Sequence, residues 1–539
     1  MAMPTTFQPP RAAEIEASVI RTSQSEDKVR VHATVREIAI VGIALTTVSL
    51  VLRLPLLGST FSSSDNASLA ARVVWWPGYS WMFYEDYGLL INLVVKFGAG
   101  LVSLLGVHVT EFWWKLPIAL IGALQPLVTY VFLRRFQDSR AGALFGSATL
   151  AVLPIHVMQS RYLWGYEILG TMFMTVALWG LLRFFQSPGR KSAVVASVAA
   201  GLYLISHGYI VPFALCVGLI AWFYGPDAPA GVTSFVSGVR LMWVHFVWVV
   251  PGLFFPLYMD SLEHAASKPS EPGFYLLQHG GDWVGAVGWP LAALCLGGFT
   301  ASFRMEGPRG RFARFLGLSG LAYLIPLFVL TPPGITVVRG YMLVGTYLWV
   351  LCAAITIGKL SENYGHIVLV VGLVCLALTT WGTAETVFAR NKLPDPAYVT
   401  PGRGIPTADP GTKAAGYLVQ KYVEPEERVL AVHEAVEIPN LVYYFRRPER
   451  AFYDLQPAES CYALQKFIKD ADVVICGEPH VEIMDQEKRF PRKTVLKSED
   501  RPRMWIYAKP DTGIPTGEFQ VEGLNRRFDR EFSWEVHFL

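Results

Sequence analysis

Long apolar stretches separated by short polar loops make up most of the chain up to about residue 390. A helix that crosses a bilayer needs about 20 mostly apolar residues, and about eleven stretches meet this requirement. They lie at residues 38–57, 116–133, 141–158, 166–185, 193–210, 211–225, 241–258, 284–303, 313–330, 340–358 and 366–387. The pattern predicts an α-helical polytopic membrane domain over residues 36–389, preceded by a polar tail at 1–35.

Residues 88–107 are nearly as apolar as the predicted spans, but Lys96 interrupts them. An amphipathic helix at the membrane surface tolerates a lysine whose ammonium group snorkels to water. We therefore expect this segment to lie in the outer interface, within a first outer loop at 58–115. Counting it as a span would reverse the orientation of every later loop.

Basic residues in the short loops set the orientation, because cytoplasmic loops are enriched in lysine and arginine. A cytoplasmic N-terminus places three basic groups on the cytoplasmic side. They are Arg134, Arg135 and Arg140; Arg183, Arg190 and Lys191; and Arg304, Arg309, Arg311 and Arg314. Residues 1–35 lack the apolar core and cleavage site of a signal peptide, so the first helix is expected to act as an uncleaved signal.

The pattern changes beyond residue 389. Residues 390–411 form a proline-rich linker in which a helix cannot persist. After it, "RVLAVHE", "ADVVICGEP" and "RMWIYAKP" are typical of short buried strands, and "GTKAAGYLVQKYV" and "ESCYALQKFIKD" have helical spacing. This alternation predicts a small extracytoplasmic α/β domain over residues 412–539, with a partly parallel sheet.

The composition agrees with a membrane protein. Of 539 residues, 52% are hydrophobic and 17% are charged, whereas soluble domains average about 25% charged residues. The net charge of +3 is too small and too dispersed to indicate a nucleic-acid partner.

Four of the six cysteines lie in apolar stretches and are expected to pack as small hydrophobes: Cys216, Cys295, Cys352 and Cys375. Cys461 and Cys476 lie in the polar C-terminal region, as a disulfide or as free thiols.

Ionisable residues at the predicted outer ends of the spans are the candidates for chemistry, because charge at membrane depth is costly and usually faces a cavity. They are Asp65, Arg72, Arg161, Glu167, His207 and Arg339. All of them fall on one side of the membrane in the predicted topology. This placement favours a single outward-facing pocket that contains two carboxylates and several cations.

Each candidate also has a structural interpretation. Asp65 lies in "SSDNAS", which suits a solvated loop or a helix N-cap equally well. Arg161 and Glu167 could form an ion pair that joins two helix ends. His207 could be an interfacial histidine without a ligand. Interface anchoring is the alternative for Arg72, Lys96, Trp75 and Trp76.

The predicted pocket would suit transfer of a sugar from a lipid phosphate. That reaction needs a base for the acceptor hydroxyl and fixed positive charge for the departing phosphate. Asp65 is the candidate base, and Arg161, His207 and Arg339 are the candidate cations. The lipid tail would then lie between helices, which explains why the site is built at a membrane surface.

Signatures of other chemistries are missing from the sequence. No HExxH, P-loop, GxSxG or CxxC motif occurs. Asp470, Ala471 and Asp472 have the spacing of a metal motif, but they precede a predicted strand and are expected to form a turn. We therefore expect neither a metal nor another cofactor.

Four ordered blocks resemble the integral-membrane glycosyltransferases of the C type (GT-C), in the branch of protein O-mannosyltransferases and the lipid A aminoarabinose transferase. The blocks are "LRLPLLGS...SSDNASLAARV", "FWWKLPIALIGALQPLVTYVFLRRF", "LPIHVMQSRYLWGYEILGTMFMTVALWGLLRFF" and "VVRGYMLVGTYLWVL". They cover residues 38–225 well and residues 310–390 loosely. The resemblance implies a GT-C membrane fold with about eleven spans and an acid in the first outer loop.

The resemblance assigns roles to particular positions. Asp65 matches the catalytic acid of the first outer loop, Glu167 the second acid, and Arg161 the arginine before that acid. His207 stands where many relatives carry a lysine proposed to touch the donor phosphate, although histidine is only partly charged near neutral pH.

Two departures from the family pattern concern the first outer loop. Trp75 and Trp76 stand before Pro77, where the aminoarabinose branch has a lysine, which argues against aminoarabinose transfer. The usual Asp-Glu pair is Asp65-Asn66 here. Donor phosphate contacts are accordingly left to Arg72, Lys96, Arg161 and Arg339, with His207 as the substitute for the family lysine.

The sequence thus predicts an inverting glycosyltransferase of a bacterial inner membrane. Its expected partners are a polyprenyl-phosphate sugar and a glycan, lipid or protein acceptor on the outer face.

One alternative is an O-antigen ligase or polymerase, which usually carries its large outer loop between late spans. The other is a lipid or solute transporter, which predicts an internal repeat and charged or broken helices near mid-bilayer; neither is evident in the sequence.

Overall fold

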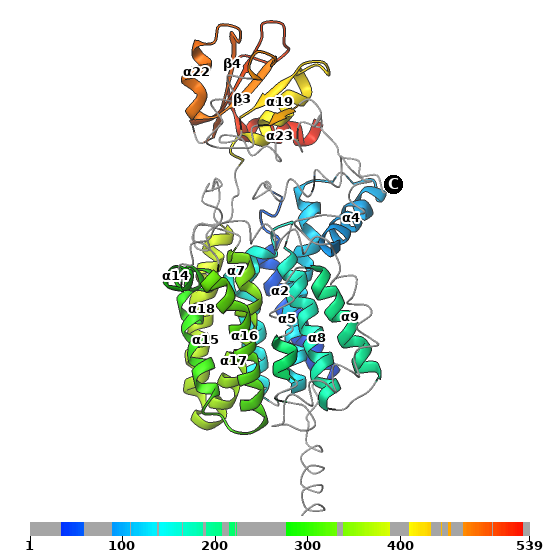
Figure 1. Ribbon diagram of the computed structural model, residues 1–539, viewed down its shortest axis with the longest axis vertical. Coiled ribbons are helices and arrows are strands. Elements are labelled where there is room, and N and C mark those ends of the chain that lie inside the picture. The colour runs from blue at the N-terminus through cyan, green and yellow to red at the C-terminus, as the bar shows by residue number, and fades with distance from the viewer. Residues whose placement is uncertain are drawn as a thin grey trace, which may run out of the picture.

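The computed structural model divides into a helical bundle and a smaller domain built on a β-sheet, stacked along the long axis (Figure 1). The structure describes residues 34–58, 70, 89–107, 109–136, 139–163, 165–186, 190–206, 215–220, 223, 276–330, 338–388, 409–432, 444, 451–453, 467–498 and 500–531. We call the end of the bundle that faces the sheet the domain end and the opposite end the far end.

Six of the described helices are long and apolar enough to cross a membrane. They are α2 (Val35–Arg53), α5 (Glu111–Phe136), α8 (Tyr166–Gln186), α16 (Gly307–Leu330), α17 (Val338–Tyr364) and α18 (His366–Phe388). The shorter helices α6 (Arg140–Val152), α7 (Pro154–Gln159) and α9 (Arg190–Ser206) run beside them. The predicted span 241–258 lies outside the described residues, so a total of eleven stays a prediction.

Two predicted spans are interrupted. The stretch 141–158 is divided between α6 and α7, because Pro154 cannot donate the hydrogen bond that would continue α6. The stretch 284–303 bends by 109° between α14 (Leu276–Val287) and α15 (Trp289–Ser302). Gly288 makes this bend with a φ of +85°, a value that glycine adopts without a Cβ clash. A broken helix, which was not evident in the sequence, is therefore present. Its first part, α14, lies at the domain end and not near the middle of the bundle, where a transporter would be expected to have one (Figure 1).

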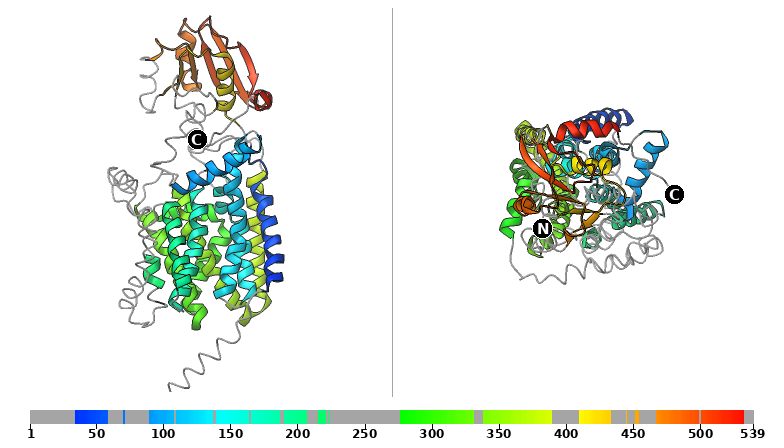
Figure 2. Two further views of the ribbon diagram at one scale, coloured as in Figure 1. Left: turned by 90° about the vertical axis from the view of Figure 1, so that its right-hand side faces the viewer. Right: turned by 90° about the horizontal axis from the view of Figure 1, so that it is seen from above.

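Helix α4 (Leu89–Leu104) lies obliquely at the domain end (Figure 2). Its outward face carries exposed apolar side chains at Leu93, Phe97 and Leu101, at the four-residue spacing of one helix face. Lys96 follows Leu93 by three residues and so lies at the edge of this face, but it is only 5% exposed. The expected snorkelling of Lys96 is therefore wrong, because its side chain is buried.

Small residues allow the helices of the bundle to approach closely. A Cβ on Gly180 of α8 would lie 2.7 Å from the backbone nitrogen of Ala196 in α9, and one on Gly298 of α15 would lie 2.7 Å from Cα of Ala353 in α17. Such contacts replace the hydrophobic effect as the source of helix association within lipid. Helix α17 is the most buried candidate span and α18 the least buried, so α17 is the centre of its half of the bundle.

The far end gathers the three basic groups that the sequence placed on one side, because α5, α8 and α15 end there and α6, α9 and α16 begin there. Glu37, in the first turn of α2, pairs with Arg134 at 3.3 Å and with Arg140 at 3.5 Å. The hydroxyl of Tyr130 donates a hydrogen bond to the same carboxylate. These contacts join the ends of three helices at the surface of the bundle.

The C-terminal domain contains a six-stranded sheet in the order β2-β1-β3-β5-β4-β6. Its strands are β1 (Val429–Ala431), β2 (Ala451–Tyr453), β3 (Val473–Cys476), β4 (Arg492–Ser498), β5 (Arg501–Ala508) and β6 (Gly517–Gln520). The pairs β1–β2, β1–β3 and β4–β6 are parallel, and the pairs β3–β5 and β4–β5 are antiparallel. Helices α19 (Thr412–Tyr422) and α23 (Val521–Glu531) pack on one face, and α22 (Val481–Gln486) packs on the other.

The sheet agrees with the predicted mixture of parallel and other pairings, and three predicted strands correspond to β1, β3 and β5. Strand β4 was not predicted, because its sequence "RKTVLKS" is largely polar. Asp472 lies in the expected turn and accepts a hydrogen bond from Lys509 at 2.6 Å. Cys476 is a free thiol buried in β3, so it forms no bridge to Cys461. Burial raises the pKa of the Cys476 thiol to about 12.

Candidate functional site

The sequence-predicted site residues fall into two groups. Asp65, Arg72 and His207 lie outside the described residues, and for Arg339 only the backbone, in the first turn of α17, is described. Lys96, Arg161 and Glu167 are described and are buried at the domain end. The single pocket expected to hold all of these residues therefore stays a prediction.

Arg161 joins the end of α2 to the junction between α7 and α8. It lies in the turn after α7 and is 2% exposed. Its Nη1 donates hydrogen bonds to the carbonyls of Leu52, at 3.3 Å, and Arg53, at 3.1 Å. These carbonyls belong to the last turn of α2, where helical backbone acceptors lack partners and where positive charge is favourable. The Nε of Arg161 is buried without a hydrogen-bond partner.

Glu167 lies in the first turn of α8 and is also buried, with 2% of its surface exposed. A carboxylate in the first turn of a helix is stabilised by the helix dipole. Its Oε2 nevertheless has no hydrogen-bond partner, and such an oxygen costs free energy unless something binds to it. No ion pair links the described side chains of Glu167 and Arg161, because Arg161 binds carbonyls of α2 instead. The structural ion pair considered for them is therefore absent.

A buried polar network begins at Arg53, whose carbonyl accepts the hydrogen bond from Arg161. Arg53 donates to Nδ1 of His156 at 2.6 Å, and the other ring nitrogen of His156 lies 2.8 Å from Oε1 of Gln125. Because arginine can only donate, the imidazole proton must be on Nε2, which donates to Gln125. The hydroxyl of Thr171 donates to the same oxygen at 3.2 Å. Side chains from α2, α5, α7 and α8 are thereby held in one arrangement.

Further ionisable residues at the domain end were not proposed from the sequence, among them Arg53, Glu111 and Lys115. Arg53 is 0% exposed, and Glu111 and Lys115 are each 4% exposed. Arg53 lies inside the predicted span 38–57, and Lys115 directly precedes the span 116–133. Charge inside or at the edge of an apolar stretch was the signal that could have found these two residues.

The buried charges at the domain end can support binding of an anion beside a carboxylate. The described cations Arg53, Lys115 and Arg161 are buried there together with the acids Glu111 and Glu167. Buried arginine is suited to phosphate because its donors are fixed in a plane. Within the described part of the chain, no three histidine, cysteine, aspartate or glutamate side chains gather as a metal site would require.

Three solved structures resemble the whole arrangement of bundle and domain. ArnT from Cupriavidus metallidurans in the apo state aligns with a TM-score of 0.56 and 13% identity, over 92% of this chain and 98% of that one. The Archaeoglobus fulgidus oligosaccharyltransferase aligns with a TM-score of 0.50 and 12% identity, over 87% and 73%. The mycobacterial arabinofuranosyltransferase AftD aligns with a TM-score of 0.53 and 16% identity, over 89% and 40%. All three are GT-C proteins.

The chain has the GT-C fold. This confirms the fold that the four sequence blocks suggested. No family model and no curated protein matches the chain. In this GT-C fold, the buried charges described above lie at the end of the bundle nearest the C-terminal domain.

Proposed function

We propose that this GT-C protein is a glycosyltransferase that moves a sugar from a polyprenyl-phosphate donor to an acceptor hydroxyl at the domain end of the bundle. The observation that carries the proposal is the buried carboxylate of Glu167, whose Oε2 has no hydrogen-bond partner, close in sequence to the buried and partly unpartnered Arg161. A site of this kind within a GT-C fold fits a substrate that brings both a hydroxyl and a phosphate.

The proposed reaction is a single displacement with inversion at the sugar. The acceptor oxygen forms a bond to the anomeric carbon, and the bond from that carbon to the phosphate oxygen breaks. Asp65 takes the acceptor's proton, and the polyprenyl phosphate leaves with the bonding electron pair. A positioned base contributes roughly 10²–10⁴-fold to such a rate.

Cations stabilise the negative charge that develops on the leaving phosphate. Arg161 is the best supported of them, because its Nε has no partner and its Nη1 is already fixed by α2. Lys96 is a second candidate, since its side chain is buried at the domain end. The remaining proposed donor-binding residues are Arg72, His207 and Arg339.

Arg161 also has a positioning role in this proposal. By holding the last carbonyls of α2, it fixes the point where the first outer loop leaves the membrane. Asp65 follows Arg53 by 12 residues in the sequence. The contact thereby restrains the start of the loop that carries the proposed base, next to the helix that carries Glu167, the proposed second acid.

The proposed location is a bacterial inner membrane, with the far end on the cytoplasmic side and the domain end outside. The clustering of basic residues at the far end supports this orientation. The domain end would then meet an acceptor that is a glycan, lipid or protein of the cell envelope. The C-terminal domain, proposed to span 412–539 after the linker 390–411, would lie on the same side.

The experiment uses purified protein in lipid nanodiscs with a panel of polyprenyl-phosphate sugars, and it measures released polyprenyl phosphate. The expected result is turnover of one donor and a loss on the order of 10²-fold or more in Asp65→Asn. Asn66→Ala, a change in the same loop, is the control and should retain turnover. Full activity of Asp65→Asn would remove Asp65 from the chemistry, and no turnover of any donor would contradict the proposed activity.

A further inference from the structure

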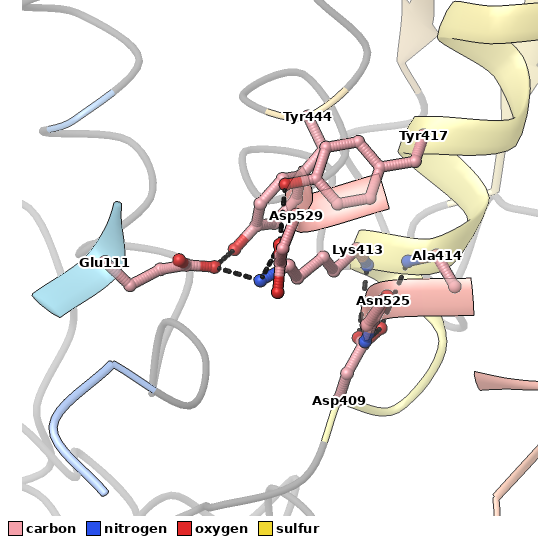
Figure 3. Close-up of polar contacts among 8 residues, drawn as sticks. All are labelled: Glu111, Asp409, Lys413, Ala414, Tyr417, Tyr444, Asn525 and Asp529. Carbon is pink, nitrogen blue, oxygen red and sulfur yellow. Dashed lines mark hydrogen bonds and ion pairs between the residues drawn. The ribbon is translucent and has the colours of Figure 1, made fainter. Parts of the chain in front are cut away.

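A buried ion pair joins the C-terminal domain to the membrane bundle. Nζ of Lys413, in the first turn of α19, lies 2.7 Å from Oε1 of Glu111, the first residue of α5 (Figure 3). The two side chains are 3% and 6% exposed. The hydroxyl of Tyr444, which is also buried, donates to the same carboxylate oxygen. Residues more than 300 positions apart in the sequence therefore share one dry contact.

The C-terminal domain holds Lys413 firmly in place for this contact. Asp409 caps α19: its Oδ1 accepts from the backbone N–H groups of Gly411 and Lys413, and its Oδ2 accepts from that of Ala414. A carboxylate at the N-terminus of a helix satisfies donors that otherwise lack partners. Asn525 of α23 donates to Asp409 at 2.9 Å. Contacts within the C-terminal domain therefore fix the start of α19 to α23, and with it the position of Lys413.

The charge of Lys413 is shared between the two parts of the molecule. The Oδ1 of Asp529, in α23, also lies 2.8 Å from this Nζ. Burial opposes the charged form, but the carboxylates of Glu111 and Asp529 hold the pKa of Lys413 above its usual value. The contact is therefore an ion pair in which Lys413 carries its charge.

Holding the C-terminal domain against the bundle does not by itself require a buried ion pair. Burying two charges costs desolvation free energy, and apolar residues of similar volume often hold an interface as well or better. The best attested use of a buried polar pair is to fix one register between two elements. At this interface the element on the bundle side is the head of α5, where Lys115 follows Glu111 by one helical turn.

We propose that Lys413 is a positioning residue for the membrane site: through Glu111, it fixes the head of α5 and holds the C-terminal domain over the domain end in one register. This inference rests on the proposed function. Lys413 touches no reacting group in it. The C-terminal domain is then part of the catalytic unit. Its removal or undocking would leave the bundle folded but lower kcat.

The test is a double-mutant cycle with Lys413→Met, Glu111→Gln and the pair of changes together. A misplaced active-site element commonly costs on the order of 10–100-fold in rate. Each single variant is therefore expected to lower kcat by about tenfold or more. The double variant should be no slower than either single variant, because the two residues act as a unit.

Lys421→Met is the matched control. Lys421 lies on the same helix and pairs with Glu531 of α23 at 2.5 Å, entirely within the C-terminal domain. It should change kcat less than about twofold, as expected for an exposed pair. Equal losses in Lys421→Met and Lys413→Met would mean that only the stability of the domain matters, and would overturn the proposal.

Hydrogen exchange provides a readout that needs no turnover. Lys413→Met should speed exchange in the backbone amides of residues 111–118, in the bundle, whereas Lys421→Met should leave them unchanged. If the wild type turns over a donor but Lys413→Met matches it in both rate and exchange, the inference fails and the proposed function stands. If no donor is turned over, the proposed function fails; unchanged exchange at 111–118 would then overturn the coupling as well, and faster exchange would support it.

Discussion

The two ends of the helical bundle contain charged residues in different surroundings. At the far end, Arg140 is 63% exposed where it pairs with Glu37, and Glu362 is 42% exposed where it pairs with Arg309. The buried Arg134 of the far end also contacts the carboxylate of Glu37. At the domain end, Arg161 and Glu167 are each 2% exposed, and neither forms an ion pair with a described side chain. Ion pairs that reach water are typical of helix ends at a membrane surface, whereas a buried charge without an ion-pair partner needs another source of stabilisation.

This difference separates two uses of charge in one membrane protein. The far-end arginines and lysines suit topology, because they need only remain on one side of the membrane. The domain-end residues have been taken out of water at a cost in free energy, which substrate binding can offset. Burial without an opposite charge in contact, rather than the number of charges, is therefore the property that distinguishes Arg161 and Glu167 from the far-end residues.

The largest expected effect comes from Arg161→Met. This change removes a cation of the proposed donor site and the hydrogen bonds to the end of α2. Turnover should fall on the order of 10²–10³-fold, as when one preorganised donor to a developing charge is lost. Arg161→Lys should recover only part of this rate, since a lysine cannot reproduce the planar donor group. Steady-state measurement of polyprenyl phosphate release checks both variants. Unchanged turnover in Arg161→Met would exclude Arg161 from the site.

A smaller effect is expected from Gly122→Ala in α5. The added Cβ would lie 2.4 Å from Cβ of Ser160, directly before Arg161, so α5 and α7 must separate. Overpacking of this kind costs about 1–3 kcal/mol in the free energy of unfolding. Gly297→Ala in α15 is the control, because a Cβ there meets nothing within 4 Å. Thermal unfolding in detergent should show a lower Tm for the first variant only; equal values would mean that the close approach is not needed.

The smallest effect is expected in the C-terminal domain, at the exposed pair of Lys493 and Asp485, whose Nζ and Oδ1 lie 2.6 Å apart. The hydrogen bond from Lys493 holds the pKa of Asp485 below its usual value. A carboxylate with a lowered folded pKa stabilises above its unfolded pKa of about 3.9, and this stability is lost as pH falls through the folded value. Lys493→Met should therefore lower Tm by less than about 2 °C at pH 7. Most of the difference should vanish near pH 2, where only the contact of Lys493 with the ring of Tyr507 remains; an unchanged difference there would show that the ion pair is not its cause.

Much of the bundle could be predicted from the sequence because long apolar stretches have few ways to satisfy their backbone hydrogen bonds in lipid except as helices. The breaks were harder to predict. Gly288 bends a continuous apolar stretch through its own backbone conformation, which leaves no trace in hydropathy. Lys96 was placed in water because a periodic pattern does not reveal what covers each face of a surface helix.

The candidate site was predictable only in part. Arg161 and Glu167 were proposed because both lie at a junction between apolar stretches; the structure buries both at the domain end, and their roles stay predictions. The contact between Glu111 and Lys413 could not be predicted, since it joins residues 302 positions apart in the bundle and the C-terminal domain. The sequence does not distinguish Arg53 from a surface anchor, which is the ordinary role of one arginine at the end of a span.

One matched pair of variants tests most directly whether the buried charges of the domain end form the catalytic site. Glu167→Gln and Glu37→Gln make the same change at opposite ends of the bundle, and release of polyprenyl phosphate is measured for both in nanodiscs. The account predicts a loss on the order of 10²-fold or more for Glu167→Gln with the fold intact. It predicts nearly full turnover for Glu37→Gln, with about 1 kcal/mol less stability. Equal turnover in the two variants, or a greater loss in Glu37→Gln, would contradict it.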